Sequence, residues 1–200
     1  VSTAQGDIAG LETRGHGLLE ADLFIDCSGL RSLLIGQHFG VPKVDCSDVL
    51  FNDRALALQV DYATPDAAVA CQTISSAQPQ GWIWDIGLPT RRGLGHVYSS
   101  RDCSDDEAAA RLLDYARRSG AAGHSLRSDP RQIRLDPGYR RECWVNNCVA
   151  IGLSAGFVEP LEASSLVLVE LAAASLAEQF PTRREDLPLL ARRFNEAFRY

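Results

Sequence analysis

Residues 21–29 have the sequence ADLFIDCSG, and this stretch indicates how the chain folds. Leu23, Phe24 and Ile25 form an unbroken apolar run, which is followed by an aspartate, a small residue, a serine and a glycine. Such a run is typical of a parallel strand that is buried on both faces. In open sheets of parallel strands, ligands bind at the loops that follow the carboxyl ends. The stretch therefore predicts either a buried strand that leads into a ligand-binding loop or a core strand that ends in an ordinary turn.

The rest of the chain mixes strand and helix patterns. Residues 8–20 are typical of a hairpin in which two glycines supply the positive φ angles of a tight turn. A capping box of Ser104 and Glu107 begins a helix over 105–119. The other elements expected are a helical segment at 30–39, strands at 53–62, 81–88 and 93–100, a strand that enters a glycine-bounded loop within 143–156, and helices at 161–180 and from 183 onward. This mixture predicts an α+β fold.

Length and charge limit the domain count and the partners. Two hundred residues without a linker, repeat or low-complexity tract suit one domain, which we expect to span 1–200. The net charge of −6, with arginines scattered among acids, argues against a nucleic-acid partner. The longest apolar stretch, 161–180, is interrupted by Glu170 and Glu178, so we expect no membrane span.

The cysteines and histidines show no metal-binding pattern. Six cysteines lie at positions 27, 46, 71, 103, 143 and 148, without a Cys-x-x-Cys pair or zinc-ligand spacing. No signal peptide is evident, so we expect free, mostly buried thiols, a cytoplasmic location and no metal site. The isolated histidines, which we expect to be structural, are His16, His38, His96 and His124.

The start of the chain is unusual. The sequence contains no methionine and begins with Val1. A complete reading frame normally supplies an initiator, so we expect a single partial domain from a longer protein; a GTG start translated as valine is the alternative. A piece that lacks part of its fold would expose strand edges and apolar surface.

Two carboxylates stand near the start of the apolar helix predicted over 161–180. Glu159 and Glu162 belong to the stretch GLSAGFVEPLEASS, residues 152–165, which follows a strand and a glycine-bounded loop. The first amides of a helix lack an intrahelical partner, and the helix dipole favours negative charge beside them. Either a glutamate caps this end, or the carboxylates point elsewhere and the amides bind another anion. The pattern alone does not name the ligand.

A pair of tryptophans distinguishes the stretch WIWDI, residues 82–86. Alternate side chains of a strand share a face, so we expect Trp82, Trp84 and Ile86 on one side. These side chains form either an aromatic face of the core or a wall that keeps water away from a reactive centre.

Three stretches, taken together, resemble the flavin-dependent tryptophan halogenases. They are EADLFIDCSGLRSLLI, GWIWDIGLPTRRGLGHVYSS and WVNNCVAIGLSAGFVEPLEASSL, in that order, and the resemblance extends over 20–181. Its specific part is the Trp-x-Trp-x-Ile signature followed by Phe-x-Glu-Pro-Leu-Glu. The resemblance implies that the chain is part of an α/β FAD/NAD(P)-binding fold similar to the flavin monooxygenases of the hydroxybenzoate hydroxylase type. It also implies that 1–40 and 143–180 are flavin-side segments, that 50–100 form a substrate-side sheet, and that 183–200 start a C-terminal helical region.

The resemblance also implies an activity. Such enzymes use reduced FAD, oxygen and a halide ion to halogenate tryptophan or a related indole or arene. The implied cofactors are therefore FAD, supplied in its reduced form by a separate flavin reductase, and a halide. The implied partners are a small aromatic substrate and that reductase.

Site residues follow from the resemblance position by position. Glu162 matches the glutamate that lies beside the substrate and assists the electrophilic substitution. A carboxylate near a developing arenium cation stabilises it and can take its proton. The other matches are Gly152, Leu153, Ser154 and Leu166 for the flavin, Ser164 and Ser165 for the halide, and Trp82, Trp84 and Ile86 for the signature that keeps substrate away from the flavin.

The chain departs from the family pattern in four places. Gly87 stands where the signature continues with proline, and Ala163, Ser164 and Ser165 replace a run that ends in glycine, which adds a side chain where the backbone approaches a halide. The one lysine, Lys43, does not match the catalytic lysine, and no Gly-x-Gly-x-x-Gly follows a strand. Two alternatives stay open: a monooxygenase-like flavoprotein without halogenase activity, and a non-catalytic remnant. We expect the 200-residue chain alone to be inactive.

Overall fold

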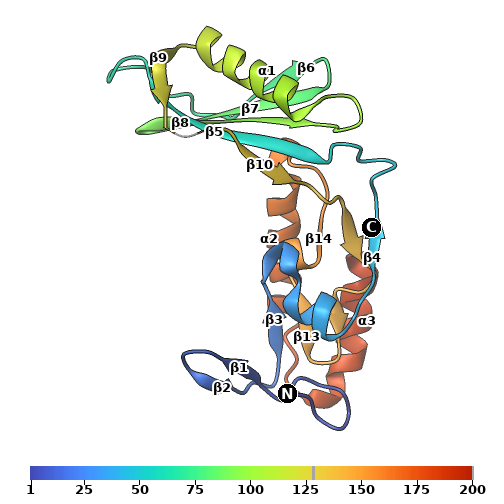
Figure 1. The fold of residues 1–200 in the computed structure, drawn as a ribbon. Helices are drawn as coiled ribbons and strands as arrows, with labels where there is room; N and C mark the ends of the chain where they lie inside the picture. The colour runs from blue at the N-terminus through green and yellow to red at the C-terminus, as the bar shows by residue number, and fades with distance from the viewer. Residues whose placement is uncertain (128, 200) are drawn as a thin grey trace. The chain divides into compact units, whose positions relative to one another are not determined.

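The computed structural model describes residues 1–127 and 129–199, without the side chains of 121–125 and 162. The chain divides into two compact units (Figure 1). The first consists of Val1–Cys46 and Gly138–Tyr200, and the second consists of Ser47–Pro137. Both units combine strands with helices, which confirms the α+β class. That 1–200 act as one partial domain stays a prediction.

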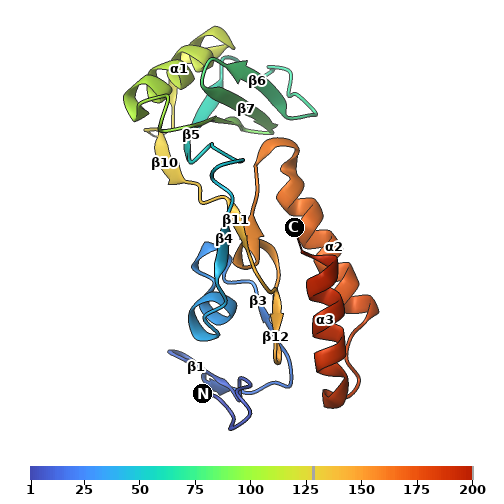
Figure 2. The same ribbon diagram turned by 90° about the vertical axis from the view of Figure 1, so that its right-hand side faces the viewer.

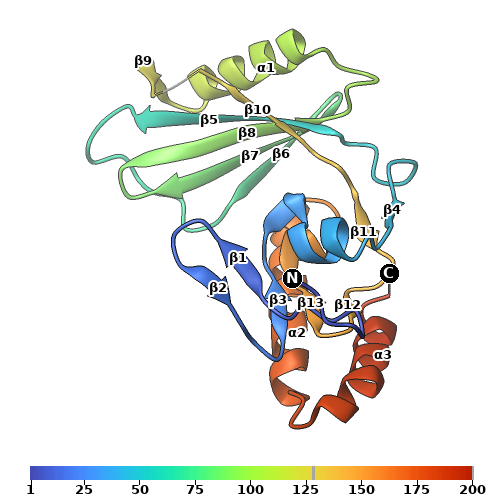
Figure 3. The same ribbon diagram turned by 60° about the horizontal axis from the view of Figure 1, so that its bottom comes forward.

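The second unit is an antiparallel sheet with a helix across one face (Figure 3). The strand order is β10-β5-β8-β7-β6, and β9 also pairs with β5. Strands at three predicted places are confirmed; β6 lies within residues 63–80, where the strand signals are weak, and the sequence patterns predict neither β9 nor β10. The elements are β5 (Arg54–Tyr62), β6 (Ile74–Gln78), β7 (Gly81–Leu88), β8 (Arg91–Tyr98), α1 (Asp105–Arg118), β9 (Ala121–Leu126) and β10 (Arg131–Arg134).

Helix α1 forms where the sequence predicts it and closes the core of this unit. Ser104 Oγ accepts a hydrogen bond from the Glu107 amide at 3.2 Å, as the capping box requires. Ala108, Leu112 and Ala116 recur at four-residue spacing and are buried against the sheet. The apolar side chains beneath them come from alternate positions of the strands and include Leu56, Leu58, Val60, Ile83 and Leu94.

An ion pair is buried at one end of this core. Arg92 Nε donates to Asp85 Oδ1 at 3.1 Å, and the two side chains are almost inaccessible to solvent. Tyr115 donates to the same carboxylate at 3.1 Å, and Arg92 also donates to Ser119 Oγ at 2.8 Å. The hydrogen bond from Arg92 to Asp85 and the charge of Asp85 raise the pKa of Arg92, although burial opposes this change. These extra partners offset the desolvation that burial of a charged pair costs.

The imidazole of His96 is completely buried between β8 and α1. Its Nδ1 lies 3.1 Å from the carbonyl oxygen of Ala108, and because a carbonyl only accepts, Nδ1 carries the proton. Burial lowers the pKa of His96, the hydrogen bond to Ala108 opposes this change, and the charge of Arg111 adds to it. The ring is therefore neutral in the folded protein, which fits the structural role expected for it.

The first unit contains the strand predicted from ADLFIDCSG. Strand β3 (Phe24–Asp26) pairs in parallel with β13 (Cys148–Ala150), as the unbroken apolar run indicates (Figure 1). Strand β12 (Trp144–Val145) pairs antiparallel with β13 on its other side. The strand expected to enter a glycine-bounded loop within 143–156 is present as β13, but β12 precedes it, so this segment holds two short strands rather than one. Asn146 adopts a φ of 51° and turns the chain back, a conformation that asparagine tolerates better than most residues.

The other elements of this unit are short. The segment expected to be helical at 30–39 is a 3-10 turn followed by a π-helix, because Gly29 and Ser32 both have positive φ. The hairpin expected over 8–20 is confirmed. The elements are β1 (Leu11–Thr13), β2 (Gly17–Leu19), η1 (Gly29–Arg31), η2 (Leu33–His38), β4 (Lys43–Asp45), β11 (Gly138–Arg140), η3 (Gly152–Ser154), β14 (Gly156–Phe157), η4 (Leu161–Ala163), α2 (Ser164–Glu178), η5 (Arg184–Asp186) and α3 (Leu187–Ala197).

Helices α2 and α3 lie side by side against the β12–β13–β3 sheet (Figure 2). Asn195 of α3 closes the β12 edge, because its Oδ1 accepts from the amides of Cys143 and Trp144 and its Nδ2 donates to the Trp144 carbonyl. Helix α2 is apolar on all sides, a composition typical of a fully buried helix. Leu166 and Leu171 are nevertheless 70% and 54% exposed, so part of its apolar surface is uncovered in this chain, as expected.

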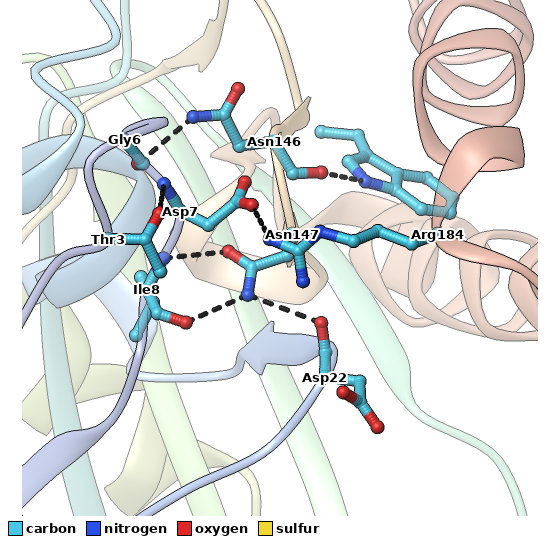
Figure 4. Close-up of polar contacts among 9 residues, drawn as sticks. Thr3, Gly6, Asp7, Ile8, Asp22, Asn146, Asn147 and Arg184 are labelled. Carbon is cyan, nitrogen blue, oxygen red and sulfur yellow. Dashed lines mark hydrogen bonds and ion pairs between the residues drawn. The ribbon is translucent and has the colours of Figure 1, made fainter.

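Asn147 ties the N-terminal segment to this sheet (Figure 4). Its side-chain amide pairs with both backbone groups of Ile8, at 2.9 Å each, and also donates to the Asp22 carbonyl at 3.2 Å. Beside it, Arg184 of η5 forms an ion pair with Asp7. Three segments far apart in sequence are therefore joined around one buried amide.

All six cysteines are free thiols. Cys103, Cys143 and Cys148 are buried as expected, but Cys27 and Cys71 are exposed, so the expectation of mostly buried thiols is wrong for these two. Among the described residues, no cluster of three or more potential metal ligands occurs. Within the same residues, no helix combines the length and the apolarity needed to cross a membrane.

We predict that His96 makes stability depend on pH. Its folded-state pKa lies below the ordinary value of 6.5, so the unfolded chain binds the proton more readily. The contribution of His96 is fully present above pH 6.5 and is lost as pH falls below it, by at most about 1.4 kcal/mol per pH unit. The measurement is the free energy of unfolding by urea at pH 5–8.

The matched variants are His96→Asn and His16→Asn. The first keeps a donor near Ala108 but cannot titrate, so the pH dependence is expected to become shallower. The second replaces an exposed ring and is expected to leave the dependence unchanged. Identical pH profiles for the wild type and His96→Asn would contradict the prediction.

Candidate functional site

The carboxylate of Asp26 organises the loop that follows β3. Asp26 is 1% exposed; its Oδ1 accepts from the amide and hydroxyl of Ser28, and its Oδ2 accepts from the amides of Leu34 and Ile35 at 2.9 and 2.8 Å. Burial by itself would raise the pKa of Asp26, but the hydrogen bonds from Ser28, Ile35 and Leu34 outweigh it and lower the pKa. The side chain is thus ionised, and its two oxygens accept hydrogen bonds from the protein itself, mostly from backbone amides.

Two serine hydroxyls join this loop to the one after β13. Ser32 is buried with a φ of 45°, and its Oγ donates to the Ser154 carbonyl at 2.9 Å. Ser154 is 1% exposed, and its Oγ lies within hydrogen-bond reach of the carbonyl oxygens of Asp26 and Ile151. The Ser154 hydroxyl is therefore engaged inside the protein, so only the backbone of this residue is left to meet a ligand.

The other two loop residues predicted to contact a flavin lie in the same 3-10 turn. Gly152 has a φ of 77°, and a Cβ placed on it would lie 3.3 Å from Val169 of α2. Leu153 is 42% exposed. Glycine is required at the first position by its backbone conformation, and leucine presents an apolar side chain to the outside of the turn.

The start of α2 is left open by its N-cap residue. Ala163 occupies this position with a φ of 54° and has no side chain able to cap the helix. The hydroxyl of Ser164 donates backward to the Glu159 carbonyl at 2.9 Å. The side chain of Glu162 lies outside the described residues, so its predicted role is untested by the geometry. Leu166, in the first turn, is 70% exposed.

A small cavity brings the glycine loop and the helix start together. It has a volume of about 20 Å³ and is lined by Gly152, Ser165 and apolar side chains that include Leu168 and Phe198. The Oγ of Ser165 is inaccessible to solvent and makes no hydrogen bond within the described part of the chain. Ser165, which the resemblance sets against a glycine, thus places at the cavity a hydroxyl without a hydrogen-bond partner among the described residues. A space of this size holds a single small species.

The tryptophan signature lies in the other unit, on β7. Trp82 and Trp84 are half-buried, with ring centroids 6.2 Å apart and rings edge to face, and Ile86 is 39% exposed. The alternate residues Ile83 and Asp85 are the ones buried in the core. The tryptophans therefore lie on the face of β7 opposite the core beneath α1, a face that also carries the buried side chain of Val97 opposite Trp82.

Gly87, where the signature departs from proline, is closely approached by another segment. A Cβ at this position would lie 2.9 Å from the Ala70 carbonyl oxygen and 3.1 Å from its amide nitrogen. Any side chain would therefore require the backbone around Ala70 to shift.

The comparison with known families agrees with these features. The family model for tryptophan halogenases matches residues 1–200. The chain belongs to the tryptophan halogenase family. Tryptophan 6-halogenase SttH of Streptomyces toxytricini is 40% identical over 177 residues, which cover 88% of this chain and 33% of that protein. Tryptophan 7-halogenase RebH of Lentzea aerocolonigenes is 38% identical over 197 residues, which cover 96% and 35%.

Solved structures of halogenases have the same fold over the matched part. A tryptophan halogenase from Shewanella frigidimarina superposes with a TM-score of 0.91 and 49% identity, covering 99% of this chain and 37% of that one. BrvH, a flavin-dependent halogenase from Brevundimonas, superposes with a TM-score of 0.87 and 38% identity, covering 96% and 38%. This chain therefore spans about a third of the length of the halogenases that it matches.

The sequence patterns do not single out two residues that hold these loops together, Asp26 and Ser32. Asp26 was visible as the polar end of an apolar strand, which is a signal for an anchoring carboxylate. Ser32 carried no signal, because serine has no preference for the left-handed conformation that it adopts here.

We predict that Asp26→Asn destabilises the protein by about 3 kcal/mol, because an amide cannot accept at both ends and leaves buried donors unpaired. Urea unfolding measures the loss. Since the pKa of Asp26 is lowered, its contribution is present above the ordinary value of 3.8 and disappears as pH falls below it. Glu20→Gln, at an exposed position of the same unit, is the control and should cost little. A loss as small as that of the control would contradict the anchoring role.

Proposed function

We propose that this chain is part of a flavin-dependent halogenase that acts on tryptophan or a related indole or arene. The family match over residues 1–200 carries the proposal. The helix start supports it: an N-cap residue without a capping side chain, a Ser165 hydroxyl without a hydrogen-bond partner among the described residues and a 20 Å³ cavity occur together. Proteins of this family named as tryptophan 6- and 7-halogenases show a similar sequence over most of this chain.

The residues at the helix start suit a halide ion. The amides of Ser164 and Ser165 begin α2, where the first amides have no intrahelical acceptor. The positive end of the helix dipole favours an anion there, and Ser165 Oγ adds a buried donor. In this proposal these two residues hold the halide, and the side chain of Ser165 substitutes for the close approach that glycine would allow.

The flavin would be held by the turn after β13 and by Leu166. Gly152, Leu153 and the backbone of Ser154 form a surface tied to Asp26 through the Ser154 hydroxyl. When bound, reduced FAD from a separate flavin reductase would react with molecular oxygen, which would be the oxidant that turns the halide into an electrophile. On this proposal the fold is of the hydroxybenzoate hydroxylase type, with 1–40 and 143–180 on the flavin side, 50–100 on the substrate side and 183–200 opening a helical region.

Glu162 is the residue proposed to act on the arene. A carboxylate beside the ring stabilises the positive charge that develops when the electrophile adds, and it can accept the proton that leaves. Trp82, Trp84 and Ile86 would form the wall that keeps the arene away from the flavin. Their partial exposure on the face of β7 opposite the core supports this role.

We predict that Glu162→Gln lowers the halogenation rate about 10²–10³-fold, as loss of one electrostatic partner typically does. The assay uses the whole gene product, read from the coding DNA on both sides of these residues, with tryptophan, bromide, reduced FAD and oxygen. Flavin binding, followed by absorbance, should be unchanged. The matched control is Glu170→Gln, which replaces an exposed carboxylate on α2 with the same amide. Equal turnover in the Glu162→Gln and Glu170→Gln proteins would remove Glu162 from the mechanism.

We predict that the 200-residue chain alone does not halogenate tryptophan, because it spans about a third of the length of its relatives. The test is mass spectrometry of the product after incubation with reduced FAD, oxygen and bromide. Halogenated product from the purified chain would contradict this prediction.

A flavin-dependent monooxygenase without halogenation is the second candidate. It is favoured by Gly87, which the backbone of Ala70 approaches closely, and by the added side chain at Ser165. The bromide assay separates the two candidates, because a monooxygenase yields hydroxylated arene whether or not bromide is present. A gene product that neither binds flavin nor gives any product would instead indicate a non-catalytic remnant.

A further inference from the structure

The indole of Trp84 lies beside small residues on the neighbouring strands. In the register of the sheet, Trp84 on β7 is opposite Gly95 on β8, and Gly95 is opposite Ala57 on β5. The two positions beside Trp84 in this row, on β8 and then on β5, therefore carry no side chain and a single methyl group. Both Trp84 and Ala57 are half-buried, and Gly95 is buried.

The contact between Trp84 and Gly95 leaves no room for a side chain. A Cβ built on Gly95 would lie 1.9, 2.2 and 2.3 Å from three indole atoms, Cζ2, Cη2 and Cε2. Gly95 does not have a positive φ, so its backbone could accommodate alanine without strain. The indole of Trp84 is thus the obstacle, and glycine is required here because of the ring above it.

Gly93 provides an internal comparison on the same strand and face. It lies two residues from Gly95, opposite Ile86, and also has no positive φ. A Cβ at Gly93 would meet nothing within 4 Å among the described residues. Two glycines in equivalent backbone settings therefore differ in whether an indole covers them.

Trp84 in turn contacts Trp82. The two ring centroids are 6.2 Å apart with an interplanar angle of 60°, an edge-to-face arrangement that depends on where each ring lies. A ring lifted from Gly95 cannot keep this geometry. The shape of the exposed aromatic surface is therefore coupled to a glycine on the neighbouring strand.

We propose that Gly95 is a positioning residue: by lacking a side chain, it seats the indole of Trp84 flat on the sheet and so sets the aromatic wall between arene and flavin. The wall itself rests on the proposed function, whereas the seating of the indole does not. Gly95 touches neither substrate nor flavin in this proposal and acts through Trp84.

The first experiment measures the coupling between Gly95 and Trp84 without catalysis. Gly95→Ala is expected to raise the unfolding equilibrium constant about tenfold or more, as overpacking of a filled site does. Gly93→Ala is expected to leave it unchanged or to lower it slightly. In a Trp84→Leu background, which removes the ring over Gly95, the same Gly95→Ala change should have almost no effect. Equal effects of Gly95→Ala with and without Trp84 would overturn the proposal.

A spectroscopic signal follows the position of the ring. The difference in near-ultraviolet circular dichroism between the wild type and Trp84→Phe defines the contribution of Trp84. Gly95→Ala is expected to lose this contribution, and Gly93→Ala is expected to keep it. Retention of the full Trp84 signal in Gly95→Ala would show that the ring has not moved and would overturn the proposal.

The second experiment tests, in the whole gene product, whether Gly95 affects how well the aromatic wall separates arene from flavin. The readout is the fraction of consumed reduced FAD that appears as brominated tryptophan, together with the amount of hydroxylated by-product. Gly95→Ala is expected to lower this fraction severalfold, while Gly93→Ala retains the wild-type value. Equal fractions in the two variants would overturn the proposal even if the ring moves. A wild-type protein that does not halogenate contradicts the proposed function instead. In that case the stability measurements with and without Trp84 alone test whether Gly95 positions the indole.

Discussion

The buried carboxylate of Asp26 is the contact on which the rest of the first unit depends. Its two oxygens accept four hydrogen bonds from the loop and π-helix that follow β3, while its own carbonyl oxygen receives Ser154 and Ile151 from the turn after β13. One residue thereby holds both loops at the carboxyl ends of two parallel strands. An ionised group in this place is stable only because its acceptors are saturated by donors that the fold itself supplies.

Left-handed backbone conformations gather around the same place. Gly152, Ser32 and Ala163 all have positive φ, although only one of them is glycine. A non-glycine residue in this region costs of order 1–3 kcal/mol and persists when the surroundings determine it. Ser32 is held by its bond to Ser154, and Ala163, as the N-cap residue of α2, has no side chain that could cap the helix. The strain thus lies in the segments that the family resemblance assigns to flavin and halide.

The second unit holds two large aromatic rings on the face of its sheet that lies opposite the core. Its core face carries an ion pair, a neutral histidine and the apolar side of α1. The opposite face can hold the indole of Trp84 because the neighbouring strands present glycine and alanine at the matching positions. The position of the Trp84 indole, and with it the contact to Trp82, therefore depends on Gly95 and Ala57, which have almost no side chain.

Local patterns by themselves determined the parallel strand, the hairpin, the helix that begins at Ser104 and the family, because apolar runs, capping residues and signature motifs are properties of neighbouring residues. The same patterns identified Gly152 and the tryptophans as special without saying what they touch. Only the tertiary structure decided that residues 143–156 form a hairpin and that the Ser154 hydroxyl is consumed inside the protein. It also decided that Gly95 must lack a side chain. The bond from Ser154 to Asp26 and the contact of Gly95 with Trp84 join residues more than ten positions apart, so no local stretch of sequence contains both partners. The hairpin depends on the positive φ at Asn146, which the apolar pattern around it does not indicate.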